Sequence, residues 1–135
     1  MKVKNEFNVA KWDEVKCSEP SNGMVTAKAS IIFMATGEIN GRFDVDYLLH
    51  YTHYDEENQH NSEVTYVGFL TFSGSICGKS GSFVLEDQGA YTPVGPVSEL
   101  VIKSGSGIGG FKGISGTGKY SAEGEKMIIE LEYSV

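Results

Sequence analysis

The chain has 135 residues, a length that suits one domain and leaves no room for a second full-sized core. Its formal net charge is -7, and its one arginine and ten lysines are scattered between acidic residues, which argues against nucleic acid or an anionic membrane surface as a partner. The 17 glycines are about twice the roughly 7% of average proteins and prolines number only 3, a composition typical of a sheet protein with many tight turns.

The first predicted strand covers residues 3–9, where apolar Val3, Phe7 and Val9 alternate with polar side chains. Trp12 follows it. Residues 20–23 are then rich in Pro, Ser, Asn and Gly, and we interpret them as a loop.

The clearest predicted unit is a hairpin from residue 24 to residue 54 that turns at Asn40-Gly41, a pair typical of a type I′ turn. Folding about this turn places Met34 opposite Tyr47 on one face, and Phe33 opposite Leu48 on the other. Both faces are then substantially apolar. We expect that one face lines an interior while the other meets a second subunit, or that loops cover one of them.

A second hairpin is predicted over residues 63–91, turning at Cys77-Gly78 and pairing Phe72 with Phe83, Leu70 with Leu85 and Gly68 with Asp87. A polar loop over residues 54–62 joins the two hairpins, and further strands are predicted over residues 97–103 and 127–135. Strands joined by tight turns form a sandwich or close on themselves, and closure removes exposed edges. The prediction is therefore one all-β domain over residues 1–135, a small closed antiparallel β-barrel.

Four stretches carry a resemblance to a known family: Phe7–Glu14, Val45–Thr52, Tyr66–Leu85 and Ser104–Gly118. In order and spacing they resemble an uncharacterised bacterial family, a domain of unknown function with an allene-oxide-cyclase-like barrel. The resemblance implies about eight antiparallel strands, an architecture related to allene oxide cyclase and the dirigent proteins, frequent oligomers and no settled activity.

The chain departs from this family at two positions that would matter for catalysis. Relatives often carry a glutamate where this chain has Leu70 and a histidine where it has Asp87. The predicted pairing places these two positions on one face, as diagonal neighbours within reach of each other. The resemblance therefore implies no acid–base pair in this chain.

Two glycine motifs resemble nucleotide-binding loops, but neither has the required context. Residues 105–110 satisfy G-x-G-x-x-G, yet the glycine-rich residues 111–118 cannot form the helix that must follow. Residues 113–119 nearly match a P-loop, except that Tyr120 stands where Ser or Thr must reach magnesium. We interpret the segment as a turn by which the chain passes the barrel end and re-enters it, and we expect no cofactor.

The remaining motifs do not indicate a metal or disulfide site. His50 and His53 point to opposite faces of their strand, so we expect no metal site. Cys17 and Cys77 are too few for a disulfide framework, the N-terminus has no apolar run, and the longest apolar stretch is too short to span a membrane. We expect a cytoplasmic protein with reduced thiols.

The candidate ligand-binding residues are polar side chains on predicted strands: Asp46, Tyr47, His50, Tyr51, Tyr66 and Asp87. Asp46 and His50 share a face; they form a binding or proton-transfer pair if that face is interior, and are solvated if it is exterior, which we favour. The tyrosines offer hydroxyls to a pocket.

Three functions remain open from the sequence. The first is binding of a small apolar ligand inside the barrel. The second is an isomerase or cyclase, which rests on architectural analogy alone. The third is a homo-oligomeric structural role without a ligand, in which the two apolar faces of the first hairpin form an interface. The volume and polarity of the interior distinguish a filled core from a cavity.

Overall fold

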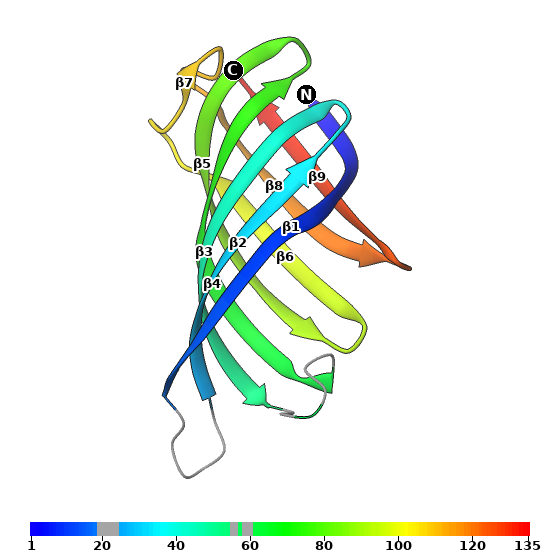
Figure 1. The fold of residues 1–135 in the computed structure, drawn as a ribbon. Helices are drawn as coiled ribbons and strands as arrows, with labels where there is room; N and C mark the ends of the chain where they lie inside the picture. The colour runs from blue at the N-terminus through cyan, green and yellow to red at the C-terminus, as the bar shows by residue number, and fades with distance from the viewer. Residues whose placement is uncertain (19–24, 55–56, 58–60) are drawn as a thin grey trace.

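The computed structural model describes residues 1–18, 25–54, 57 and 61–135. In this part of the chain nine antiparallel strands form one sheet (Figure 1). They are β1 (Lys2–Ser18), β2 (Val25–Ala35), β3 (Ile39–His53), β4 (Glu63–Ile76), β5 (Lys79–Thr92), β6 (Gly95–Ile102), β7 (Ile108–Gly109), β8 (Ser115–Glu123) and β9 (Lys126–Ser134). The predicted loop at residues 20–23 lies outside the described residues, as does most of the predicted loop at 54–62.

Eight of the strands pair in a ring. Each of β1 to β6 pairs with its neighbour in sequence, β6 pairs with β8, β8 with β9, and β9 returns to β1. The two-residue strand β7 pairs only with β5. The all-β antiparallel prediction is therefore confirmed, with β8 as a strand that the sequence did not indicate because Gly116 and Gly118 interrupt its pattern. Among the described residues, no helix is long and apolar enough to cross a membrane.

The second predicted hairpin is confirmed residue by residue. Phe72 lies opposite Phe83, Leu70 opposite Leu85 and Gly68 opposite Asp87. The turn residues Cys77 and Gly78 have φ angles of 49° and 83°, the positive values that a type I′ turn requires. Turn chemistry and hydrophobic alternation thus specify the same register.

The register predicted for the first hairpin is wrong. Phe33 lies opposite Phe43 rather than Leu48, because the chain reverses between Ala35 and Gly41 and not at Asn40-Gly41. Gly41 instead lies inside β3, where a Cβ atom would come within 2.3 Å of the Ser73 carbonyl oxygen of β4. The glycine serves a close approach of two strands rather than the turn.

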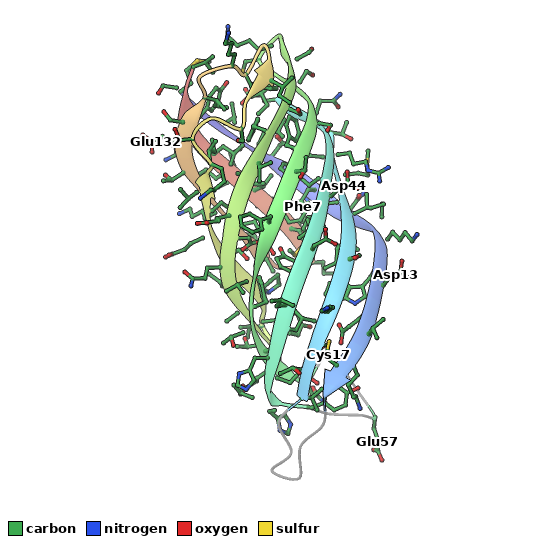
Figure 2. The ribbon with its side chains drawn as sticks, turned by 90° about the vertical axis from the view of Figure 1, so that its left-hand side faces the viewer. Phe7, Asp13, Cys17, Asp44, Glu57 and Glu132 are labelled. Atoms are coloured by element: carbon green, nitrogen blue, oxygen red, sulfur yellow. The ribbon has the colours of Figure 1, made fainter. Side chains whose placement is uncertain are left out.

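The corrected register gives the first hairpin one buried face. Ile31 and Phe33 of β2 share that face with Val45 and Tyr47 of β3, and all four side chains are at most 4% exposed. The observed partner of Phe33 differs from the predicted one by an odd number of residues, and such a difference exchanges the two faces of β3 relative to β2. The other face is mostly polar, and Asp44 extends from it to solvent (Figure 2).

One end of the ring is filled by aromatic side chains. Phe43, Phe72 and Phe83 come from three adjacent strands, with ring centroids 4.8 and 5.3 Å apart along the row. Phe111 comes from the glycine-rich segment between β6 and β8 and packs against Phe83 with a centroid distance of 5.1 Å. No helix follows either glycine motif, and the segment carries Phe111 across the filled end before β8 begins at Ser115.

Candidate functional site

The end of the ring away from the phenylalanine cluster is hollow. β1 pairs with β9 only from Lys2 to Phe7, although it continues beside β2 to Ser18. The part of β1 that extends beyond its pairing with β9 borders, together with the other strands of the ring, a cavity of about 380 Å³. Its wall is mostly apolar, with residues that include Ile31, Phe33, Leu49, Val64, Pro96 and Met127.

A β-bulge directs two residues of β1 into this cavity. The register of β1 against β2 shifts between Val9 and Lys11, after which Trp12 lies opposite Ile31 and Glu14 opposite Ala29. Ile31 and Ala29 face inward, so Trp12 and Glu14 do as well. The Glu14 carboxylate accepts hydrogen bonds from the Tyr51 hydroxyl at 2.6 Å and from Trp12 Nε1 at 3.2 Å. These three side chains form the polar part of the cavity border.

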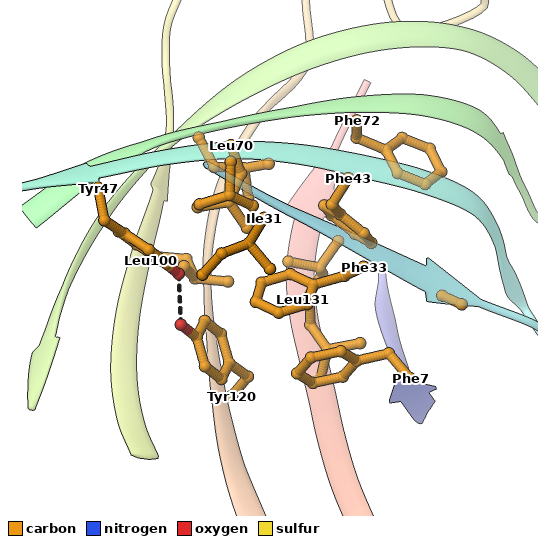
Figure 3. Close-up of a cluster of buried hydrophobic side chains, with 14 of the residues drawn as sticks. Phe7, Ile31, Phe33, Phe43, Tyr47, Leu70, Phe72, Leu100, Tyr120 and Leu131 are labelled. Carbon is orange, nitrogen blue, oxygen red and sulfur yellow. Dashed lines mark hydrogen bonds between the residues drawn. The ribbon is translucent and has the colours of Figure 1, made fainter. Parts of the chain in front are cut away.

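A chain of hydroxyl groups lies in the wall of the cavity. The Tyr47 hydroxyl donates to Asp87 Oδ2. It is also hydrogen-bonded to the Tyr120 hydroxyl, as the dashed line in Figure 3 shows. The Tyr120 hydroxyl lies 3.3 Å from that of Tyr66, which lies 2.5 Å from Ser98 Oγ. The three tyrosines line the cavity, whereas Asp87 and Ser98 lie behind them. We call these five residues the hydroxyl chain.

Two glycines explain how tyrosines reach partners two strands away. Tyr47 of β3, Gly68 of β4 and Asp87 of β5 lie in one cross-strand row, and Tyr66, Gly89 and Ser98 form a second row one strand further on. In each row the glycine has no side chain, so the tyrosine can extend over the middle strand. A Cβ atom on Gly89 would lie 2.6 Å from Ser98 Oγ and 2.7 Å from the Tyr66 hydroxyl.

Burial sets the protonation of the hydroxyl chain. It raises the pKa of Asp87 to about 6 from its ordinary value of 3.8, against the opposing effect of the hydroxyls of Tyr47, Ser98 and Tyr120. Burial also raises the pKa of Tyr47, Tyr66 and Tyr120, which therefore keep their protons at neutral pH. Asp87 Oδ1 is buried and has no hydrogen-bond partner among the described residues. Among the five residues of the hydroxyl chain, Asp87 is therefore the one that titrates near neutral pH.

The structure separates the predicted site residues into two groups. Tyr47, Tyr51 and Tyr66 line the cavity, and Asp87 lies behind Tyr47. Asp46 and His50 are exposed on the outer surface of β3, because their even-numbered positions point away from the interior. Asp46 accepts a hydrogen bond from Ser30 Oγ at 2.8 Å there. The condition under which Asp46 and His50 would form an interior pair is not met.

Sequence reasoning missed four residues of the site: Trp12, Glu14, Ser98 and Tyr120. Ser98 was recognisable as a polar residue at an inward position of an otherwise apolar face, between Val97 and Glu99 that point outward. Glu14 depends on the bulge, which no local pattern indicated. Tyr120 was noticed only as a departure from a P-loop. The family departures Leu70 and Asp87 do share a buried face, as predicted.

The described residues contain no group of three or more His, Cys, Asp or Glu side chains that could hold a metal ion. His60 lies outside the described residues. Cys17 and Cys77 are both exposed free thiols.

Comparison with known proteins gives a family but no activity. A solved structure of a protein with unknown function from the DUF3224 family of Shewanella oneidensis MR-1 matches with a TM-score of 0.80 and 24% identity, covering 99% of this chain and 96% of that one. No curated protein matches the chain. The model of the family described as "Protein of unknown function (DUF3224)" matches residues 3–133. The chain therefore belongs to the DUF3224 family.

Proposed function

We propose that this protein binds a small, mostly apolar molecule in the cavity, with the tyrosine hydroxyls orienting the polar group of the ligand. The observation that carries this proposal is a cavity of about 380 Å³ whose apolar wall is interrupted by the hydroxyls of Tyr47, Tyr66 and Tyr120. Ligand sites usually measure about 300–1,000 Å³ and combine apolar walls with a few convergent polar groups.

The packing of the ring supports the same proposal. An eight-stranded barrel has an interior that side chains can fill or that can hold one small ligand. Here the phenylalanine cluster fills one end, and the other end is hollow. We extend the proposal to the architecture, a barrel of the allene oxide cyclase and dirigent type, and to a cytoplasmic location, which suits two exposed free thiols.

Filling the cavity tests ligand binding. Leu49→Trp places a larger side chain in the cavity wall and is expected to weaken the binding of an apolar dye such as Nile red by about tenfold. Val101→Trp is the control, because Val101 is 48% exposed on the outer surface of β6. Fluorescence titration measures both variants, with circular dichroism to verify folding. Equal dye affinity in the two folded variants, or no binding by the unsubstituted chain, would contradict the proposal.

An isomerase or cyclase is the second candidate function. The observation that favours it is the buried Asp87 carboxyl joined to Tyr47 at the cavity wall, an arrangement suited to general acid–base catalysis near neutral pH. This pair would take the role that Asp46 and His50 cannot fill from the outer surface. A turnover that survives Asp87→Asn unchanged would remove this mechanism.

We also propose that the chain forms a homo-oligomer through the outer surface of β3 and β4. Leu48, Val67 and Phe69 are 45–57% exposed there, and Leu48 lies directly opposite Val67. Exposed apolar side chains that adjoin one another are typical of interaction surfaces. Phe69→Lys is expected to shift the mass measured by light scattering to that of a monomer, while Val15→Lys on β1 leaves the oligomer intact. A monomeric unsubstituted chain would contradict this proposal.

A further inference from the structure

We propose that the ligand of the cavity carries a positively charged group, such as a protonated amine, which the carboxylate of Glu14 and the ring of Trp12 hold at the mouth of the cavity. The mouth is the part of the border formed by Trp12, Glu14 and Tyr51. This inference rests on the proposed ligand-binding function and names the chemical class of the ligand.

The charge of the cavity wall has one sign. Among the described residues that line the cavity, Glu14 is the charged side chain, and the lining contains no lysine, arginine or histidine. Asp87 lies behind Tyr47 and adds a second negative charge when the pH exceeds its pKa of about 6. The whole chain has a formal net charge of -7. An organic anion would therefore meet like charge in the cavity, whereas a cation meets opposite charge.

The Glu14 carboxylate is held in position but still has room to accept from a ligand. Tyr51 donates to its Oε2 at 2.6 Å and Trp12 Nε1 donates to its Oε1 at 3.2 Å, so each oxygen receives one hydrogen bond. An ionised carboxylate offers about four lone-pair sites, which leaves a site on each oxygen for an N–H group. None of the ion pairs between described residues involves Glu14. Two fixed donors thus orient a charge that is available to a ligand cation.

The tryptophan beside this carboxylate suits the same ligand group. Trp12 lines the cavity and is 51% exposed, so its side chain borders both the cavity and solvent. Its N–H lies in the plane of the indole ring and is used by Glu14, which leaves the faces of the ring for other contacts. A cation over the face of an aromatic ring is attracted to it, and tryptophan is the strongest such partner. Charge and ring therefore favour one kind of group at one place.

The protein makes a contact of this kind with its own lysine next to the mouth. Nζ of Lys16 lies over the ring of Tyr54, 4.7 Å from the ring centroid. Tyr54 in turn packs edge-on against Tyr51, with 5.0 Å between the ring centroids. An ammonium group is thus already placed on an aromatic ring that adjoins the mouth.

Three ligands built on one naphthalene frame test the inference: 1-naphthylmethylamine is a cation at neutral pH, 1-naphthalenemethanol is neutral and 1-naphthoate is an anion. At about pH 7 we expect the amine to bind about tenfold more tightly than the alcohol, which corresponds to about 1.4 kcal/mol, and the anion to bind most weakly. Isothermal titration calorimetry measures the three affinities. Equal binding of amine and alcohol would overturn the inference and leave ligand binding intact, whereas no binding of any of the three would overturn both.

Variants then locate the charge that is responsible. Glu14→Gln keeps an oxygen acceptor but removes the charge, so the ratio of amine to alcohol affinity is expected to fall to about one while the alcohol affinity is unchanged. Asp13→Asn is the matched control and should retain the preference, because Asp13 is the next residue of β1 and its side chain is 66% exposed. A preference that survives Glu14→Gln, verified as folded by circular dichroism, would assign it to Asp87 or to the net charge and overturn the inference.

A third variant tests the ring. Trp12→Leu is expected to weaken binding of the amine about threefold more than binding of the alcohol, because leucine keeps an apolar wall but has no aromatic face. Equal losses for the two ligands would show that Trp12 serves as apolar wall alone, and would overturn its part in holding the cation.

Discussion

Asp87→Asn is expected to abolish most of the loss of stability that Asp87 causes as the pH rises from about 3 to about 7. Asp87 is 2% exposed, and its burial raises its pKa to about 6. Asparagine keeps an acceptor for the Tyr47 hydroxyl and cannot ionise. It also puts two N–H donors into this buried place, where Oδ1 has no hydrogen-bond partner among the described residues, but their effect on stability does not vary with pH.

The dependence on pH follows from the direction of this shift. A carboxyl group whose pKa is raised by folding binds its proton more tightly in the native state than in the unfolded state. Its contribution to stability is therefore complete below the unfolded value of 3.8, and it is lost as the pH rises through about 6. The gap between the two values corresponds to about 3 kcal/mol. We expect the stability difference between Asp87→Asn and the unsubstituted chain to grow by about that amount between about pH 3 and pH 7.

Urea unfolding over this pH range measures the effect. Asp46→Asn is the matched control, because it makes the same acid-to-amide substitution on the exposed face of β3. We expect this variant to keep most of the pH dependence of the unsubstituted chain. Parallel stability curves for Asp87→Asn and the unsubstituted chain would show that Asp87 titrates alike in the folded and unfolded states.

The two hairpins show how far local patterns determine this fold. In the second hairpin, Cys77-Gly78 is the turn and also the centre of the hydrophobic alternation, so two independent signals agree. In the first hairpin they disagree: Asn40-Gly41 has the stronger turn chemistry, but the apolar faces of the two strands match only when the chain reverses before Gly41. Burial of a whole face outweighs the preference of one dipeptide.

The site was less predictable than the fold, for a reason that lies in its geometry. Tyr47, Tyr51 and Tyr66 were identifiable from their strand positions alone. The contacts that give them a function join β3 to β5 and β4 to β6, across an intervening strand. Such contacts depend on where a glycine falls in the middle strand once the register is set. The pairing of β3 with β4, which places Tyr47 beside Gly68, joins the two hairpins, and no local sequence pattern specified its register.

Gly68→Ala is accordingly expected to be the most damaging small substitution in the site. The added Cβ atom would lie 2.1 Å from the Asp46 carbonyl oxygen and 2.8 Å from Cδ1 of Tyr47. The first contact is with backbone, which cannot move without opening the pairing of β3 and β4, and the second displaces the ring that bonds to Asp87. We expect a loss of about 3 kcal/mol or more in the free energy of unfolding, at the upper end for overpacked interiors.

A second glycine separates this effect from the general cost of replacing glycine. Gly124, in the turn between β8 and β9, has a φ of +66° and no atom within 4 Å of a Cβ position. Asparagine tolerates that conformation, so Gly124→Asn is expected to cost less than about 1 kcal/mol. If urea unfolding gave similar small losses for both variants, the strands would be able to separate around Gly68 at little cost. The path of Tyr47 across β4 to Asp87 would then depend on something other than the missing side chain.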